Sequence, residues 1–326
     1  MGLRVHLLHP PDEEALAHLR EGLDDDVALT CGPDRPEPAM YQVLVAGRPS
    51  RDDLSASPAL HTLIIPWSGL PAQTRELLQD FPGIAIHNLH HNAAPVAELA
   101  VALFLGAAKF LIPFDGALRQ GDWTPRYRPT PAALLQGKTA LILGYGAIGQ
   151  RVARVCQALG MDVLATRRSL PAPVQEDGVA VHPAGALPDL LPRTAALFIT
   201  LPLTPETEGL IGTAELATLP AGAVLVNVGR GAVVDQEALF HALQSGHLRA
   251  AGLDVWYNYP PDEESRTATL PADYPLHELE NVVLSPHRGG STDETARLRM
   301  THLARLLNCA ARDEPLPNKV DVTAGY

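Results

Sequence analysis

Short apolar runs recur along the chain, separated by stretches in which polar and apolar positions mix. Apolar runs bounded by turn residues predict buried strands, and the mixed stretches predict covering helices. In the first hundred residues the expected strands are Leu3–Leu8, Val43–Val45, Leu63–Ile65 and Ile84–Ile86. A long apolar helix is expected from about Pro95 to Lys109, because proline is tolerated in the first turn of a helix.

The same alternation restarts after an irregular connection, Gly121 to Pro131, which contains three prolines. The strands expected beyond it are Ala140–Leu143, Asp162–Thr166, Val179–His182, Ala196–Thr200, Val224–Asn227, Ala250–Val255 and Val282–Ser285. A last helix is expected from about Asp293 to Ala311. Strands that alternate with helices in this way predict parallel sheets covered by helices, so the expected fold class is α/β.

Composition and charge narrow the possible partners. A length of 326 residues suggests two domains, and 46% apolar with 19% charged residues is a globular composition. The net charge of −12 argues against a nucleic-acid-binding surface.

The most apolar helical stretch, Leu99–Ala108, is far shorter than the roughly 20 residues of a membrane span. Cys31, Cys156 and Cys309 are too scattered for a disulfide framework, so a cytoplasmic protein is expected.

A glycine-rich turn between a strand and a helix is the most informative stretch. Its residues are Gly144, Tyr145, Gly146, Ala147, Ile148 and Gly149. In such a G-x-G-x-x-G turn the first glycine allows the tight turn, the second lets the backbone approach a pyrophosphate, and the third permits close packing of helix on strand. The helix N-terminus adds free N–H groups and a positive dipole end. The stretch therefore predicts dinucleotide binding.

The end of the next strand indicates which dinucleotide binds. NAD sites usually place an acidic residue there, about 20 residues beyond the turn, to bind the ribose hydroxyls. Here the strand is followed by Arg167, Arg168 and Ser169, and the nearest later acids, Glu176 and Asp177, lie beyond two prolines. A guanidinium pair beside a hydroxyl suits the 2′-phosphate of NADP(H). Because 22 of the 25 basic residues are arginine, the missing acid is the stronger observation, and NADP(H) is expected in preference to NAD(H).

Several stretches together resemble the D-isomer-specific 2-hydroxyacid dehydrogenase family, which includes glyoxylate and hydroxypyruvate reductases. They are Asn92–Glu98, Gly121–Trp123, Gly144–Gly149, Leu201–Thr207, Val226–Gly231, Gly252–Val255 and Ser285–Gly290, and they occur in the family's order. The resemblance implies two Rossmann-like domains with the active site in the cleft between them. A flavodoxin-like substrate domain would comprise residues 1–103 and 286–326, and an inserted NAD(P)-binding domain residues 104–285. It also implies homodimers, with the inserted domain supplying most contacts.

The resemblance also implies catalytic roles for Arg230 and His287. Arg230 would bind the substrate carboxylate and polarise its carbonyl, which suits a permanently charged planar group. His287, with an ordinary pKa near 6.5, would protonate the developing alkoxide or accept the proton in reverse. The further cofactor contacts that the resemblance implies are Leu201, Pro202, Thr207, Val228, Gly229, Arg230, Asp254, His287, Gly289 and Gly290.

A loop in the N-terminal part resembles the family's substrate loop, whose backbone N–H groups hold the substrate carboxylate. Its residues are Trp67, Ser68, Gly69 and Leu70. Gly69 would permit a close approach of the backbone, and Trp67 would shape the pocket. The histidines His87, His90 and His91 lack further ligands at a fixed spacing, so no metal site is expected.

One position departs from the family pattern. The family has a glutamate that pairs with the catalytic histidine and raises its pKa, and Tyr259 stands in its place. Tyr259 would bond to His287 directly and leave it a lower pKa, or Asp262, Glu263 or Glu264 would swing in as the missing carboxylate, or activity would be weak or absent. We favour the second interpretation, because the following loop is acidic at its start and several residues longer than usual.

The same loop carries the aromatic residues Trp256, Tyr257, Tyr259 and Tyr274. They either form a wall over the substrate or pack the long loop against its domain or a dimer partner, and packing is slightly favoured. The expected function is hydride transfer between NAD(P)H and a small 2-oxo acid of the glyoxylate or hydroxypyruvate type. Two alternatives stay open. One is a dehydrogenase of another small anion, such as formate or phosphite. The other is a nucleotide-binding interaction protein with little turnover, for which Tyr259 is the main argument.

Overall fold

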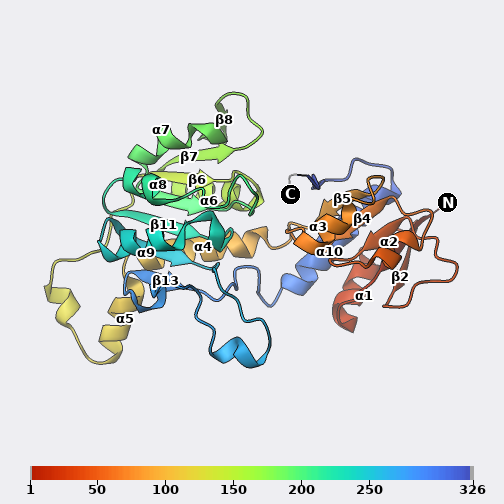
Figure 1. Ribbon diagram of the computed structural model, residues 1–326, viewed down its shortest axis with the longest axis horizontal. Coiled ribbons are helices and arrows are strands. Elements are labelled where there is room, and N and C mark those ends of the chain that lie inside the picture. Colours follow the sequence, from red (N-terminus) through yellow and green to blue (C-terminus); the bar gives the residue numbers. More distant parts are fainter. Residues whose placement is uncertain (1, 324–326) are drawn as a thin grey trace. The chain divides into compact units, whose positions relative to one another are not determined.

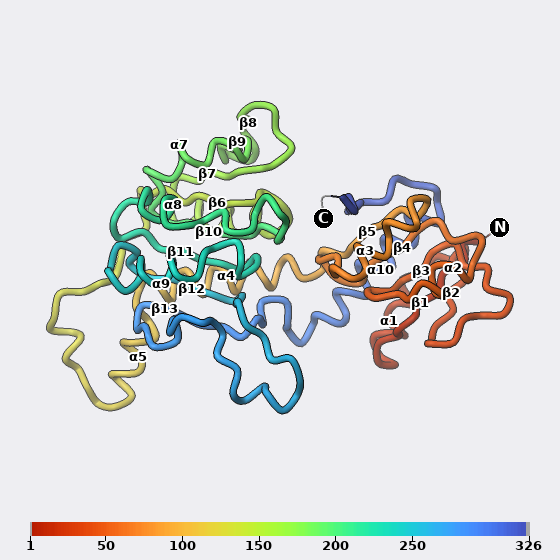
Figure 2. The backbone as a smooth tube through the Cα atoms, in the orientation of Figure 1, coloured from red at the N-terminus to blue at the C-terminus, as the bar shows by residue number. Residues whose placement is uncertain are grey.

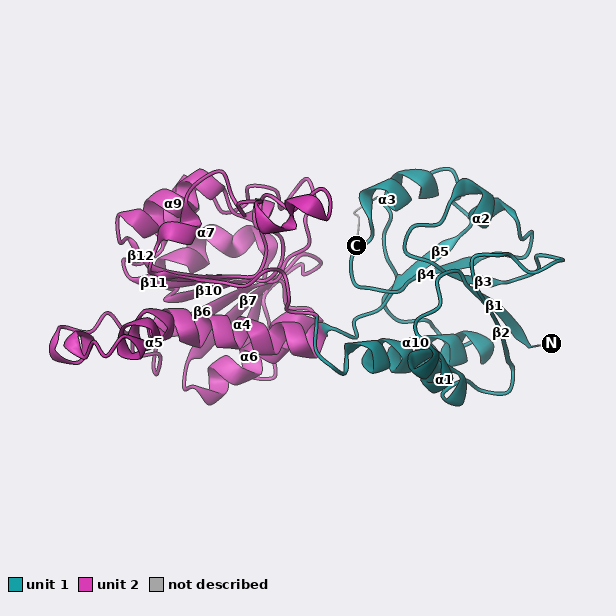
Figure 3. Cartoon of the chain, turned by 90° about the horizontal axis from the view of Figure 1, so that it is seen from below, with its two compact units in different colours: residues 1–92, 291–326 teal, residues 93–290 magenta. Residues whose placement is uncertain are grey.

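The chain divides into two compact units, which Figure 3 shows in different colours. The computed structural model describes residues 2–323. Within that range, unit 1 comprises residues 2–92 and 291–323, and unit 2 comprises residues 93–290. Figures 1 and 2 trace how the last segment of the chain returns to the unit in which the chain began.

Unit 1 is a five-stranded parallel sheet between two layers of helices. Its strands are β1 (Leu3–Leu7), β2 (Val27–Cys31), β3 (Val43–Val45), β4 (Thr62–Ile65) and β5 (Ala85–Asn88). They lie in the order β2-β1-β3-β4-β5, the flavodoxin-like arrangement. One face is covered by α1 (Glu13–Glu21) and α10 (Thr295–Ala311), and the other by α2 (Arg51–Ser55) and α3 (Ala72–Leu78). The sequence did not predict β2, an edge strand whose residues are at most partly buried although four of the five are apolar.

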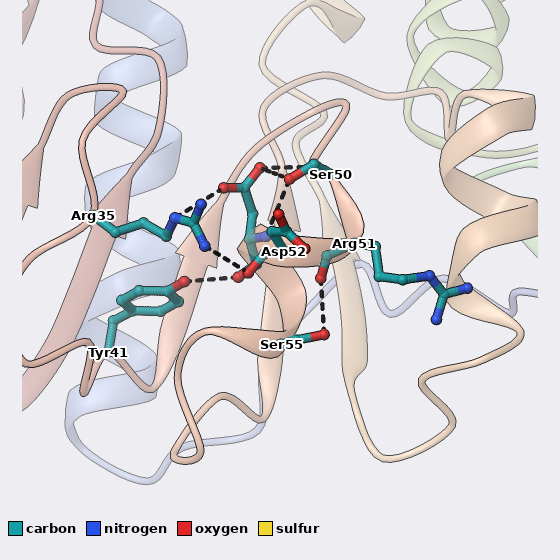
Figure 4. A network of polar contacts seen from close by, with 7 residues as sticks. Arg35, Tyr41, Ser50, Arg51, Asp52 and Ser55 are labelled. Carbon is teal, nitrogen blue, oxygen red and sulfur yellow. Dashed lines mark hydrogen bonds and ion pairs between the residues drawn. The ribbon is translucent and has the colours of Figure 1, made fainter.

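A polar network fixes the start of α2, just beyond the carboxyl end of β3 (Figure 4). The Asp53 N–H donates to the Ser50 hydroxyl at 3.1 Å, and the Ser50 N–H donates to the Asp53 carboxylate at 2.8 Å, which completes a capping box. The Tyr41 hydroxyl donates to the Asp53 carbonyl at 2.7 Å. Gly47 in the same loop lies under the Trp67 ring, since a Cβ there would stand 1.8 Å from Cη2. The network therefore supports the loop against which Trp67 rests.

Unit 2 contains an eight-stranded sheet. Its strands are β6 (Thr139–Leu143), β7 (Asp162–Arg167), β8 (Val174–Glu176), β9 (Val179–Pro183), β10 (Ala196–Ile199), β11 (Ala223–Asn227), β12 (Leu248–Leu253) and β13 (Val282–Leu284). The order is β13-β12-β11-β10-β6-β7-β9-β8, and β8 alone runs antiparallel to its neighbour. The central part repeats the 3-2-1-4-5-6 order of dinucleotide-binding sheets, with the topological switch point between β6 and β10. Together with unit 1, this confirms the predicted fold class.

Helices cover both faces of this sheet. One layer holds α4 (Ala93–Ala108) and α6 (Ala147–Ala158), and the other holds α7 (Leu187–Leu190), α8 (Thr213–Thr218) and α9 (Gln236–Gln244). The helix α5 (Leu111–Arg119) follows α4. Within residues 2–323 no single helix is long and apolar enough to cross a membrane, and α4 and α5 meet that test only as a pair bent by 66°.

The boundaries of the compact units differ from the predicted domain boundaries. Residues 93–103 and 286–290 were expected in the substrate domain, whereas both segments belong to unit 2. The helix α4 packs on β12 so closely that a Cβ at Gly252 would stand 2.8 Å from the Leu103 Cβ. The turn after β13 is tied to the end of β12 through Asp254. These contacts hold both segments to the larger sheet.

Candidate active site

The glycine turn has the geometry of a pyrophosphate site. Gly144 has a φ of +96°, and a Cβ at Gly149 would stand 2.1 Å from the Gly144 carbonyl oxygen, so both positions require glycine. Nothing within 4 Å would meet a Cβ at Gly146. The helix α6 begins directly after Gly146, and no side chain caps it. Uncapped N–H groups beside open space fit an anionic group of a dinucleotide.

The loop after β10 supports this turn from across the switch point. The Thr200 hydroxyl donates to the Gly144 carbonyl at 2.7 Å. The predicted cofactor residues Leu201, Pro202 and Thr207 lie on the same loop, where the Thr207 hydroxyl donates to the Pro202 carbonyl at 2.7 Å. Thr207 thus closes its own loop. Thr200 was not identified from the sequence as a support of the glycine turn. Its position directly after β10, the strand across the switch point from β6, could have indicated that role.

At the end of β7, Arg167 is already paired with a carboxylate. Its Nη1 donates to Glu176 Oε1 at 2.8 Å and its Nη2 donates to Oε2 at 2.5 Å. The expectation that no acid lies at this strand end is therefore wrong. The antiparallel strand β8 pairs with β9, which separates it from β7, and the Glu176 side chain reaches Arg167 although two prolines separate them in sequence. Arg168 and Ser169 lie exposed in the turn that follows β7.

Arg230 is carried by a turn at the carboxyl end of β11. The Asn227 amide donates to the Arg230 carbonyl at 2.9 Å, and its oxygen accepts from the Gly229 N–H at 3.0 Å. The glycines on either side are tightly enclosed, since a Cβ at Gly231 would stand 2.3 Å from the Trp256 carbonyl oxygen and one at Gly229 would stand 2.5 Å from the Leu201 carbonyl oxygen. The guanidinium is partly exposed, and its Nη1 donates to the Gly229 carbonyl at 2.7 Å.

His287 lies in a second turn, which Asp254 organises. The buried Asp254 carboxylate accepts hydrogen bonds from the Ser285 hydroxyl at 2.5 Å, the Arg288 N–H at 2.8 Å and the Gly289 N–H at 2.9 Å. His287 has a φ of +57°, a left-handed conformation that is uncommon outside glycine. Asp254 was predicted as a cofactor residue, and here it fixes the turn that carries the histidine. The other predicted cofactor residues, Val228, Gly229, Gly289 and Gly290, lie on these same two turns.

Tyr259 bonds directly to the histidine ring. Its hydroxyl oxygen lies 2.9 Å from His287 Nδ1 and accepts from the Trp256 N–H at 3.1 Å. Burial raises the pKa of Tyr259, so the phenol stays protonated at neutral pH. Burial also lowers the pKa of His287 below 6.5, an effect that Asp254 opposes and Arg230 reinforces. The first of the three sequence interpretations therefore matches the geometry of the site.

The acidic residues of the following loop, which the sequence favoured as the missing carboxylate, bond within their own turn in this structure. Asp262 accepts from the Ser265 N–H and hydroxyl at 2.9 and 2.8 Å, and Glu263 pairs with Arg266 at 2.5 Å. Glu264 begins the short 3-10 helix Glu264–Thr267. Local side-chain bonds stabilise this turn by itself, and no carboxylate from it contacts His287.

The aromatic residues of the loop mainly pack it against unit 2. Trp256 is buried and donates from Nε1 to the Ser285 carbonyl at 2.8 Å. The Tyr257 hydroxyl donates to the Val234 carbonyl at 2.8 Å, and Tyr274 packs against Phe240. Tyr259 is the exception, since it is 47% exposed and faces His287.

The predicted substrate loop of unit 1 follows β4. The Asn88 amide donates to the Ser68 carbonyl at 2.7 Å, and the Leu89 N–H donates to the Trp67 carbonyl at 3.4 Å. Trp67 and Leu70 pack against the core of unit 1, while Ser68 and Gly69 are partly exposed. Sequence reasoning missed Asn88 as a support of this loop.

The three histidines near the end of β5 do not assemble a metal site. His87 Nδ1 lies 2.7 Å from the Pro317 carbonyl oxygen, and burial lowers the pKa of His91 to about 4. Among residues 2–323, no group of three or more histidine, cysteine, aspartate or glutamate side chains is placed to hold a metal ion.

Known proteins share the sequence and the fold of this chain. Residues 101–289 match the model of the NAD binding domain of D-isomer specific 2-hydroxyacid dehydrogenases. The chain is 40% identical over 213 residues to the glyoxylate reductase of Aeropyrum pernix, which covers 64% of this chain and 60% of that protein. It is 36% identical over 251 residues to the glyoxylate/hydroxypyruvate reductase B of Pectobacterium atrosepticum, which covers 76% and 75% of the two chains.

A solved structure agrees over the whole chain. The D-isomer specific 2-hydroxyacid dehydrogenase of Xanthobacter autotrophicus Py2, in complex with NADPH and MES, has a TM-score of 0.79 and 26% identity, with 100% of both chains covered. Other relatives are longer, and the chain spans 42% of the D-3-phosphoglycerate dehydrogenase of Methanocaldococcus jannaschii, with 33% identity over 232 residues, 71% of this chain.

Proposed function

The chain belongs to the D-isomer-specific 2-hydroxyacid dehydrogenase family, and from that premise we propose that it reduces small 2-oxo acids with NADPH. Glyoxylate and hydroxypyruvate are the first substrates to test. The observation that carries the proposal is the pair of turns that hold Arg230 and His287. Both lie at the carboxyl ends of strands, where open α/β sheets bind their ligands.

In this proposal, Arg230 binds and polarises the substrate and His287 supplies the proton. Arg230 binds the substrate carboxylate through its planar fork and stabilises negative charge on the carbonyl oxygen. His287 donates a proton from Nε2, because its Nδ1 faces Tyr259. The bound dinucleotide supplies the hydride.

The proposed preference for NADPH rests on the end of β7. Arg167, Arg168 and Ser169 suit a 2′-phosphate, while the glycine turn suits the pyrophosphate of either dinucleotide. The structure of the Xanthobacter relative contains NADPH, which supports the same preference. The proposal includes no metal ion.

A substrate panel tests the proposed function directly. Glyoxylate, hydroxypyruvate, pyruvate and other 2-oxo acids are assayed with NADPH and with NADH in parallel, and formate and phosphite are assayed as hydride donors to NADP⁺. We expect oxidation of NADPH by at least one small 2-oxo acid. Equal or better rates with NADH would contradict the cofactor preference. Binding of the cofactor with no turnover of any compound would favour an interaction protein, for which Tyr259 is the supporting observation.

The pH dependence of reduction follows from the lowered pKa of His287. Reduction needs the protonated ring, and the protonated fraction falls as pH rises through the pKa of His287. The rate should therefore fall with rising pH, and the midpoint of this fall should lie below pH 6.5. We expect Tyr259→Glu to move this decline to higher pH by at least about one unit, because a carboxylate favours the charged imidazolium. The measurement is kcat/KM for the best substrate from pH 5 to pH 9.

Matched variants separate the two candidate partners of the histidine. Tyr259→Phe removes the phenol hydroxyl without adding charge, so the pH profile should not move to higher pH. Glu263→Gln and Glu264→Gln should leave the profile of the wild type unchanged. Two results would contradict the role given to Tyr259. One is a pH profile that shifts in Glu263→Gln or Glu264→Gln, and the other is a pH profile of Tyr259→Glu that is identical to that of wild type.

We also propose that the protein is a homodimer that associates through the α5 segment, residues 111–134. This segment lies away from the sheet of unit 2 in Figures 1 and 2. Six of its large hydrophobic residues are exposed by half or more: Leu111, Ile112, Leu118, Trp123, Tyr127 and Leu134. A patch of this kind in a folded chain is typical of an interface with another protein.

Replacing Leu111 and Ile112 together by aspartate should convert the dimer to a monomer, because two buried charges would stand in an apolar interface. Sedimentation velocity measures the change. The matched control is Leu270→Asp, which alters a leucine of similar exposure outside the segment. A wild-type monomer, or dissociation by the control alone, would contradict the proposed interface.

A further inference from the structure

Glu176 has no role in the proposed reaction, yet it lies at the proposed 2′-phosphate site. We propose that Glu176 limits the preference for NADPH over NADH, because it neutralises Arg167 and repels the 2′-phosphate. This inference rests on the proposed function, since it concerns the cofactor site of the same enzyme.

The position of Glu176 is set by the strands around it. In the antiparallel pair β8–β9, Glu176 stands opposite Val179, which is fully buried. The next strand across, β7, ends with Arg167 opposite Pro183. Glu176 therefore pairs four residues before the position on β9 that is opposite Arg167, and the two long side chains close that distance. The carboxylate comes from a strand that the sequence did not predict, so the spacing along the sequence did not reveal the contact.

The contact with Arg167 is bidentate. Both carboxylate oxygens accept, from Nη1 at 2.8 Å and from Nη2 at 2.5 Å, and the two side chains are only about one-third exposed. A guanidinium has five N–H groups, so two of them serve Glu176 and the Nε edge has no protein partner among the described residues. Arg167 can therefore reach a phosphate while Glu176 stays bound to it, with the carboxylate and the phosphate on neighbouring edges of one cation.

Tyr145 connects this ion pair to the glycine turn. The Arg167 guanidinium carbon lies 5.6 Å from the centroid of the Tyr145 ring, and the Tyr145 N–H donates to the Thr166 carbonyl at 3.0 Å. Tyr145 is itself the second residue of the turn and is buried. The pair thus lies beside the turn that suits the pyrophosphate, at the end of the strand where the adjoining ribose of a dinucleotide is expected.

The negative charge of Glu176 should weaken the binding of NADPH and not strengthen it. The Arg167 guanidinium holds the pKa of Glu176 below its ordinary value, so the carboxylate stays ionised at neutral pH. The pair has no net charge, and a phosphate monoester carries about −1.5 to −2 charges. The carboxylate therefore weakens binding of NADPH, whereas NADH presents only a hydroxyl at that place. The partial exposure of the pair limits the effect to a few-fold.

The experiment measures binding directly. Dissociation constants of NADPH and NADH are determined by cofactor fluorescence for wild type and Glu176→Gln. We expect Glu176→Gln to bind NADPH about three- to fivefold more tightly and NADH no more tightly. The matched control is Asp24→Asn, which removes one negative charge from the Asp24–Arg312 ion pair in unit 1. It should leave both constants unchanged.

Other outcomes overturn the inference. Weaker NADPH binding by Glu176→Gln would mean that the carboxylate serves to position Arg167, and equal changes for both cofactors would mean a general effect on the fold. Arg167→Gln provides a second variant, which should weaken NADPH binding and leave NADH binding nearly unchanged. Loss of binding of both cofactors in that variant would contradict the assignment.

The same measurements distinguish this inference from the proposed function. If wild type binds neither dinucleotide and turns over no 2-oxo acid, the proposed function fails and this inference fails with it. If wild type reduces a 2-oxo acid with NADPH but Glu176→Gln leaves the ratio of the two dissociation constants unchanged, only this inference is wrong.

Discussion

Replacing His287 by asparagine should lower kcat/KM for the best 2-oxo acid by about 10²–10⁴-fold, the usual contribution of a general acid. Asparagine is the appropriate replacement because His287 has a φ of +57°, and asparagine tolerates the left-handed region better than most residues. The turn that Asp254 holds should therefore stay intact. The loss would report the missing proton donor and not a displaced backbone.

Three measurements separate the loss of a proton donor from a loss of cofactor binding or of stability. Steady-state kinetics give kcat and KM, cofactor fluorescence gives the dissociation constant of NADPH, and thermal unfolding reports stability. We expect a large fall in kcat, with cofactor binding and stability close to those of wild type. A variant that keeps more than about one-tenth of the wild-type kcat/KM would show that another group donates the proton.

Replacing Arg230 by lysine should lower kcat/KM by about 10²–10³-fold even though the positive charge is kept. A guanidinium can donate two parallel hydrogen bonds to a carboxylate, and an ammonium group cannot reproduce that geometry. Here the Nη1 bond to the Gly229 carbonyl helps to fix the direction of the guanidinium. Lysine cannot make the same contact and donate in parallel, so both the KM for the acid and kcat should suffer.

The control for this prediction is Arg312→Lys, an equivalent change at the Asp24 ion pair in unit 1. It should alter kcat/KM by less than about twofold, as surface substitutions usually do. Arg230→Gln should be at least as impaired as the lysine variant, because it also loses the charge. An Arg230→Lys enzyme within threefold of wild type in both KM and kcat would contradict the role of Arg230 in binding the acid.

The proposed cofactor and substrate sites are lined by positive groups, whereas the whole protein is negatively charged. The chain carries a formal charge of −12, yet the proposed cofactor and substrate are both anions. Affinity must then come from groups that act at short range, namely Arg230, Arg167 and Arg168 at the end of β7, and the N-terminus of α6. Glu176 shows that even these groups are moderated, since it neutralises one of them.

Much of the fold could be predicted from the sequence, because central strands and long helices leave strong periodic patterns. The strands β6, β10 and β11 are almost entirely apolar, β7 has a buried apolar centre, and all four appear where expected. The strands β2 and β8 were missed; both are edge strands without a fully buried residue, and β8 has only three residues. The omission of β8 had a chemical consequence, since that strand carries Glu176.

The α/β class and the phosphate-binding turn follow from residues that are adjacent in the chain, and the same local patterns single out Arg230 and His287 as candidate site residues. The tertiary structure sets which side chains meet. It paired Glu176 with Arg167, bonded Tyr259 to His287, and turned the carboxylate of Asp254 toward the histidine turn. Partners of this kind come from separate strands and loops, so the path of the backbone between them decides the contact. A local pattern of polar and apolar residues carries no record of that path.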